Sequence, residues 1–206
     1  YSMPETSSGL NAYIASGVRC CHESIRAEDA LAKMRLGMYA QLREGSAWHD
    51  VKETVKSITE NNIDTRYATL VSDDTHPSTL ITKGHMDYIV KRAIEEGVNP
   101  ITAIQMVTIN VAQCFGMDRD LGSISPGRWA DIVLISDLTQ VKVEKVLING
   151  EVVAEHGKTI VEIPRGVYPE YSKDTMKVGR ELTPQDFVIH VEDKSKDTAV
   201  ARVIEI

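Results

Sequence analysis

Apolar residues recur every three or four positions in several stretches of the first 115 residues. This spacing predicts amphipathic helices over residues 9–16, 27–36, 48–58, 84–96 and 101–115. Short apolar runs between them predict strands over 18–21, 38–42 and 67–72. Each predicted strand is followed by polar residues and then by a helix, in units of roughly 20 to 30 residues, which is typical of a parallel β/α array. The pattern therefore predicts an α/β fold.

The pattern changes after Gly116. A turn-rich segment over 121–127 precedes apolar runs at 130–135 and 145–153, and the second run is interrupted by Asn149-Gly150. An Asn-Gly pair between two apolar runs is a strong hairpin signal, so a small β domain begins near Leu121. Residues 167–183 are polar, and the last two apolar runs, 186–191 and 200–206, predict strands of a further unit.

Composition narrows the class of protein. With 206 residues, of which 42% are hydrophobic, the chain is long enough for a sizeable core in one or two domains. Its net charge is −7 without a basic cluster, which argues against nucleic acid or an anionic membrane as a partner. The three cysteines, Cys20, Cys21 and Cys114, lack zinc-type spacing and predict no disulfide framework. We therefore expect a cytoplasmic protein.

Charged residues follow each of the three predicted strands, as His22-Glu23, Arg43-Glu44 and Asp73-Asp74. The carboxyl ends of parallel strands are where active sites of such folds lie. A metal-dependent hydrolase needs imidazole and carboxylate ligands there, together with a carboxylate that moves a proton. His22 and Asp73 have suitable chemistry. Taken alone, His22 also fits an ordinary hydrogen-bonded histidine and Asp73 a helix cap. The other histidines near or on helices and in the tail, His49, His85, His156 and His190, are expected to be structural or surface residues, and Cys114 to be part of the core.

Several segments, in order along the chain, resemble one known family. The most informative are Cys21-His22-Glu23-Ser24, Leu42-Arg43-Glu44-Gly45-Ser46-Ala47 and Ser72-Asp73-Asp74-Thr75-His76-Pro77, with further matches at 10–17, 36–39, 93–97 and 104–110. They resemble the adenine deaminase family of the amidohydrolase superfamily. Residues 121–131 are similar to the segment by which many amidohydrolases return from their barrel to a β domain.

The resemblance implies that the chain is the C-terminal portion of such a protein. Residues 1–118 would be the last part, about three β/α units, of a metal-dependent hydrolase (β/α)8 TIM barrel. Residues 119–165 would be a small β-sandwich domain, and 166–206 the start of a C-terminal α/β or β domain. The implied activity is hydrolysis of adenine to hypoxanthine and ammonia in purine salvage. It would require divalent metal, two ions of manganese, iron or zinc per complete site, in a homo-oligomer.

The resemblance also assigns roles to residues. His22 would be the metal ligand at the end of the sixth barrel strand. Asp73 would be the eighth-strand aspartate that binds metal and serves as the catalytic general base, moving a proton from the attacking water to the departing amine. The remaining residues of the strand ends would line the purine pocket: Glu23, Arg43, Glu44, Ser46, Asp74 and His76.

The family's other ligands, a first-strand His-x-His, a bridging acidic residue and a fifth-strand histidine, have no counterpart in this sequence. Ser2-Met3-Pro4-Glu5 stands where the fifth-strand histidine would be expected, so that ligand is either lost or cut away. Three β/α units cannot close an eight-stranded barrel. We therefore expect the missing N-terminal half as a partner and no activity without it. The alternatives are another amidohydrolase acting on a cyclic amide, or an inactive amidohydrolase-like scaffold subunit.

Overall fold

The computed structural model describes residues 7–191, 195, 198 and 200–202. Two compact units are present, Tyr1–Val161 and Glu162–Ile206. The expected position of the fifth-strand histidine, Ser2–Glu5, and the last four residues of the expected final strand, 203–206, lie outside the described residues. The division into three domains with boundaries at 118 and 165 stays a prediction.

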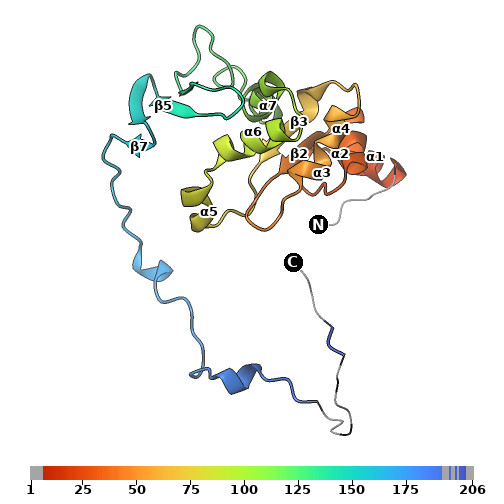
Figure 1. Ribbon diagram of the computed structural model, residues 1–206, viewed down its shortest axis with the longest axis vertical. Helices are drawn as coiled ribbons and strands as arrows, with labels where there is room; N and C mark the ends of the chain where they lie inside the picture. Colours follow the sequence, from red (N-terminus) through yellow and green to blue (C-terminus); the bar gives the residue numbers. More distant parts are fainter. Residues whose placement is uncertain (1–6, 192–194, 196–197, 199, 203–206) are drawn as a thin grey trace. The chain divides into compact units, whose positions relative to one another are not determined.

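Three parallel strands form the sheet of the first unit, in agreement with the predicted β/α array. They are β1 (Cys20–Cys21), β2 (Tyr39–Arg43) and β3 (Ala68–Val71), in the order β1-β2-β3 (Figure 1). Leu42 pairs with Leu70 in the register of β2 and β3, and both side chains are fully buried. Most side chains of β2 and β3 are buried, as expected for a parallel sheet with both faces covered.

Helices connect and cover the strands. They are α1 (Ser7–Ala15), α2 (Ala27–Arg35), α3 (Val51–Thr54), α4 (Lys56–Thr59), the 3₁₀ turn η1 (Thr65–Tyr67), α5 (Pro77–Thr82), α6 (Met86–Glu95), α7 (Pro100–Val107) and α8 (Ile109–Cys114). Helix α2 lies beside β2, and α6 and α7 lie beside β3 (Figure 1). One cluster of buried side chains joins these elements, including Ala30, Leu42, Leu70, Ile89 and Met106. The core thus forms between the sheet and its helices.

Two predicted helices are wrong in their extent. The helix expected over 48–58 begins only at Val51, because Gly45 N–H donates to the carbonyl oxygen of Trp48 at 2.8 Å and holds residues 45–48 in a turn. The helix expected over 101–115 breaks at Thr108, whose backbone is not helical (φ −123°, ψ −95°). The Thr108 hydroxyl donates to the carbonyl oxygen of Ile104 at 2.7 Å, a bond that bends helices.

The first unit also contains a four-stranded antiparallel sheet. Its strands are β4 (Ile132–Ile135), β5 (Val143–Ile148), β6 (Glu151–Glu155) and β7 (Lys158–Thr159), in sequence order. The predicted hairpin at Asn149-Gly150 is confirmed: it joins β5 to β6, and both residues have positive φ, 51° and 82°, as a two-residue turn of this kind requires.

The second unit does not contain the strand predicted over 186–191. Its described regular elements are two 3₁₀ turns, η2 (Glu170–Ser172) and η3 (Pro184–Phe187). Proline at the first position of η3 and the bond from Thr183 N–H to the Asp186 carboxylate, 2.7 Å, favour a capped turn over an extended strand. Residues 200–202 are not in a strand either.

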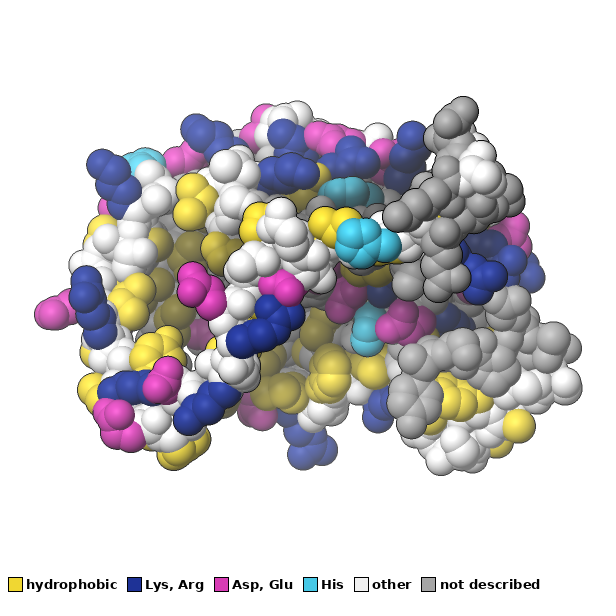
Figure 2. Space-filling view, turned by 90° about the horizontal axis from the view of Figure 1, so that it is seen from below, with side chains coloured by type: hydrophobic (Ala, Val, Ile, Leu, Met, Phe, Trp, Pro, Cys, Tyr) yellow, Lys and Arg dark blue, Asp and Glu magenta, His cyan; other side chains and the backbone are white. Residues whose placement is uncertain are grey.

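Charged side chains of both signs are exposed on one face of the molecule (Figure 2). On the face drawn in Figure 2, basic and acidic side chains are interspersed, with hydrophobic side chains exposed among them. None of the helices among the described residues combines the length and the apolar content that a bilayer-spanning segment needs.

Cys114 lies in the core, as predicted, and is 3% exposed. Burial, followed by the neighbouring Cys20 thiol, raises the pKa of Cys114 to about 11. Because only the thiolate reacts with alkylating reagents, the alkylation rate of Cys114 should rise about tenfold per pH unit from pH 8 to pH 10 without a plateau. Mass spectrometry of the alkylated chain, with Cys114→Ser to identify the site, measures this rate.

A plateau near pH 9 would contradict the raised pKa. The sign for stability follows from the same shift. The folded chain holds the Cys114 proton more tightly than the unfolded chain. The contribution of Cys114 to the free energy of unfolding is therefore complete below pH 9 and is lost as pH rises toward 11.

Candidate functional site

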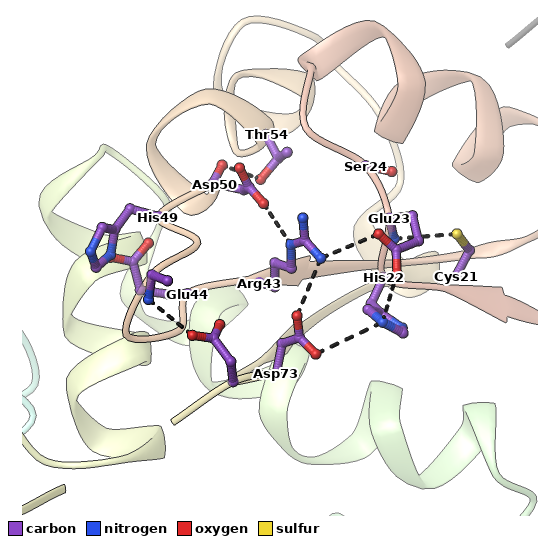
Figure 3. A network of polar contacts seen from close by, with 12 residues as sticks. Cys21, His22, Glu23, Ser24, Arg43, Glu44, His49, Asp50, Thr54 and Asp73 are labelled. Atoms are coloured by element: carbon purple, nitrogen blue, oxygen red, sulfur yellow. Dashed lines mark hydrogen bonds and ion pairs between the residues drawn. The ribbon is translucent and has the colours of Figure 1, made fainter. Parts of the chain in front are cut away.

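His22 and Asp73 meet at the carboxyl ends of the parallel strands, as the sequence predicts. His22 directly follows β1, and Asp73 follows β3 after one intervening residue. Their Nε2 and Oδ1 atoms are 3.9 Å apart, and His22 Nε2 lies 3.0 Å from Glu23 Oε1 (Figure 3). The His22 side chain is 46% exposed and that of Asp73 31%. Both groups therefore remain accessible to a ligand.

Arg43, the last residue of β2, contacts carboxylates that follow the two neighbouring strands. Its Nη1 contacts Glu23 Oε2 at 3.3 Å and Asp73 Oδ2 at 3.2 Å, and its Nε donates to Asp50 Oδ2 at 2.6 Å (Figure 3). The Trp48 ring lies 5.0 Å from the guanidinium carbon. Burial by itself lowers the pKa of Arg43, but the bond to Asp50 and the charges of Asp50, Glu23 and Asp73 outweigh it and raise that pKa. Arg43 thus stays charged and fixes three carboxylates.

The backbone at Asp73 is in the left-handed region, with φ of 55°. Two bonds from the β2 end hold the next residue: Ser46 N–H donates to the Asp74 carbonyl oxygen at 2.8 Å, and Ala47 N–H to Asp74 Oδ2 at 3.0 Å. Non-glycine residues rarely adopt this conformation. The turn after β2 therefore helps to set the direction of the Asp73 side chain.

Gly45 makes this contact possible, because a Cβ atom there would lie 2.1 Å from Asp74 Oδ1 and 2.5 Å from the Asp74 carbonyl oxygen. We expect Gly45→Ala to push the Asp73-Asp74 segment away and to lower the free energy of unfolding by about 1–3 kcal/mol. Urea denaturation measures this loss. Gly166→Ala is the control, since a Cβ there meets no atom within 4 Å. Equal stability of the two variants would contradict the steric reason.

Glu44 is buried, with a side chain 3% exposed. Its Oε1 accepts from His49 Nδ1 at 3.0 Å and lies 3.9 Å from Arg92 Nε. Its Oε2 has no hydrogen-bond partner among the described residues, and the same holds for Asp74 Oδ1 and Thr75 Oγ1. A buried carboxylate oxygen without a donor is costly, so Glu44 Oε2 is suited to receive a hydrogen bond from a bound molecule.

Ser46 and His76 are near one another. The Ser46 hydroxyl donates to Thr79 Oγ1 at 2.9 Å and accepts from the backbone N–H of His76 at 2.8 Å. His76 precedes α5 and is exposed. These bonds connect the segment after β2 to the start of α5. A role of Ser46 or His76 in substrate binding stays a prediction.

Asp50, Trp48 and His49 belong to the site but were not predicted. All three lie in the loop before α3, where the sequence analysis expects a helix. His49 was expected on a helix and instead pairs with Glu44 in an isolated β-bridge. The only local sequence signal for this loop is Gly45-Ser46, a pair that favours a turn after a strand.

His22 and Asp73 offer an imidazole and a carboxylate as possible metal ligands. Imidazole and carboxylate ligands bind zinc at 2.0–2.2 Å, and the separation of His22 Nε2 and Asp73 Oδ1 is compatible with one ion between them. No group of three or more histidine, cysteine, aspartate or glutamate side chains suited to a metal occurs within the described part of the chain. The two donors therefore fit part of a metal site, and further ligands would have to come from elsewhere.

Known proteins with similar sequences were compared with the chain. Residues 56–153 match the model of the amidohydrolase family. The chain is 63% identical over its whole length to an adenine deaminase of Clostridium botulinum (strain ATCC 19397 / Type A) and 52% identical to one of Moorella thermoacetica, and it spans 34% of each. A solved amidohydrolase structure gives a TM-score of 0.49 at 19% identity, over 74% of this chain and 44% of the other.

The chain thus spans about a third of the length of these curated relatives, and the matched third is their C-terminal part. Members of this family are generally metal-dependent. Residues 56–153 of the chain are thus similar to the amidohydrolase family.

Proposed function

We propose that this chain is the C-terminal part of a cytoplasmic adenine deaminase, which hydrolyses adenine to hypoxanthine and ammonia. The observation that carries the proposal is the meeting of His22 and Asp73, 3.9 Å apart, at the ends of strands in one parallel sheet. The names of the relatives supply the substrate. The complete enzyme would contain this chain together with the part that the relatives have in addition.

Each residue has a role in this proposal. His22 and Asp73 would hold the metal. The metal would lower the pKa of a bound water toward neutral pH. Asp73 takes a proton from the attacking water and passes it to the departing amine nitrogen, so that C6 of the purine gains oxygen and ammonia leaves. Arg43, at 3.2 Å, holds the Asp73 carboxylate in place.

Five further side chains would line the purine pocket with Arg43: Glu23, Glu44, Ser46, Asp74 and His76. Glu44 has the strongest support, because its buried Oε2 lacks a donor that a purine N–H could supply. The Arg43 guanidinium is paired mainly with carboxylates of the chain itself. Its contribution to the pocket would therefore be to shape the site.

Two metal ions per complete site, of manganese, iron or zinc, and a homo-oligomeric assembly are part of the proposal. Imidazole and carboxylate ligands are compatible with all three metals. The outer edges of β1 and β3 pair with no other described strand, which supports the proposal that more barrel strands accompany this chain.

The experiment is an ammonia-release assay on the complete enzyme with adenine and added Mn²⁺, with metal content measured in parallel. We expect ammonia and hypoxanthine in equal amounts and no activity from the 206-residue chain alone. Hydrolysis of a cyclic amide without action on adenine would favour another amidohydrolase. A folded, metal-free and inactive complete protein would favour the scaffold alternative.

A further inference from the structure

Lys33 is a buried cation that the proposed chemistry does not use. It lies on α2 and is 3% exposed. Its Nζ donates to the Ser24 hydroxyl at 2.6 Å and lies 3.6 Å from the Cys21 sulfur. Within the described residues, no carboxylate lies within ion-pair distance of Lys33. Its partners are therefore a hydroxyl and a sulfur, not a carboxylate.

Burying an ammonium group without a counter-charge is unfavourable unless its hydrogen bonds are well satisfied. A methionine has a similar length and would fill the same space without that penalty. A lysine here is thus suited to make hydrogen bonds and poorly suited to serve as core filling.

Both partners of Lys33 belong to the segment that follows β1. Cys21 and Ser24 flank His22 and Glu23, and the Cys21 sulfur also accepts from the Glu23 backbone N–H at 3.3 Å. Ser24 is fully buried and Cys21 is 8% exposed, whereas the side chains of His22 and Glu23 are 46% and 38% exposed. The ammonium group thus contacts both buried ends of a short segment whose middle faces the site (Figure 3 shows the segment).

We propose that Lys33 is a positioning residue that holds residues 21–24 from behind and so fixes His22 and Glu23 at the site. The inference rests on the proposed function for its catalytic consequence, but its structural part can be tested without it. Removal of the ammonium group leaves the Ser24 hydroxyl and the Cys21 sulfur without their shared donor. The contacts of Glu23 with Arg43 and of His22 with Asp73 remain, but they lie on the exposed side of the segment.

The test uses Lys33→Met in the complete enzyme. We expect hydrogen exchange in peptides covering 20–26 to be at least tenfold faster, because the Glu23 amide loses the fixed sulfur that protects it. Mn²⁺ retained after gel filtration and kcat for adenine should both fall, and KM should rise because Glu23 lines the proposed pocket. Ser24→Ala removes only the 2.6 Å bond and should shift exchange in the same direction by a smaller factor.

Met34→Ala is the matched control. Met34 is the next residue of α2, is also 3% exposed and packs in the main core, away from the 21–24 contacts. It should lower the unfolding temperature and leave exchange over 20–26 unchanged. Equal exchange in Lys33→Met and the unchanged protein, or the same increase in Met34→Ala, would overturn the inference. Failure of the unchanged enzyme to release ammonia would instead overturn the proposed function, and the exchange result would still stand.

Discussion

Asp73→Asn is expected to lower kcat for adenine by about 10²–10⁴-fold in the complete enzyme, which is the usual effect of removing a general base. The amide has the size of the carboxylate but cannot accept the proton of the attacking water. Asparagine is the appropriate substitution, because it tolerates the left-handed backbone found here, with φ of 55°. Alanine would add backbone strain, and the effect of that strain on kcat could not be separated from the loss of the base.

Steady-state kinetics with adenine measure the change. Asp64→Asn is the control, since Asp64 is exposed, pairs with Arg66 and precedes β3 at the opposite end of the strand. The control should leave kcat unchanged. An Asp73→Asn enzyme with more than a tenth of the original kcat would show that another group moves the proton.

Arg43→Met is expected to lower the free energy of unfolding by about 3 kcal/mol at pH 7. The substitution removes the charge that Glu23, Asp50 and Asp73 share. Breaking a buried ion pair by removing one partner costs about 3–5 kcal/mol, and the partial exposure of the carboxylates places the expected loss at the low end. Urea denaturation measures it.

An exposed ion pair supplies the control for this loss. Arg66→Met, which removes an exposed arginine paired with Asp64, should change stability by less than about 1 kcal/mol. Equal losses in Arg43→Met and Arg66→Met would contradict the role given to burial of the Arg43 contacts.

The β/α order, the hairpin at Asn149-Gly150 and the meeting of His22 with Asp73 could be predicted because each depends on local pattern. Strand ends of a parallel sheet share one edge, so two strands separated in sequence deliver their following residues to the same place. The position of His22 and Asp73 directly after predicted strands was therefore sufficient to predict that they lie close together.

Trp48, His49 and Asp50 could not be placed from the sequence. The apolar spacing of Val51, Val55 and Ile58 extends back to Trp48 and fits a helix. Residues 45–48 instead form a turn that is braced by Asp74, a contact between distant parts of the chain. Periodicity contains no information about such a contact.

Lys33 was missed for a related reason. The apolar positions of its helix, Ala27, Leu31 and Met34, predict that a lysine beside them faces solvent. Its burial depends on Ser24 and Cys21, which offer hydrogen-bonding atoms inside the fold. A charged residue in a buried position becomes predictable only when the atoms that satisfy it are known.

The unpaired outer edges of β1 and β3 also bear on how this chain behaves during synthesis. A flat strand edge with free N–H and C=O groups can pair with any other extended chain, including a second copy of itself. Because β1 and β3 are each paired on one side only among the described strands, copies of the chain can pair edge to edge and aggregate. Production of the 206-residue chain by itself should therefore yield mostly insoluble protein, whereas co-expression with the rest of the barrel should restore solubility.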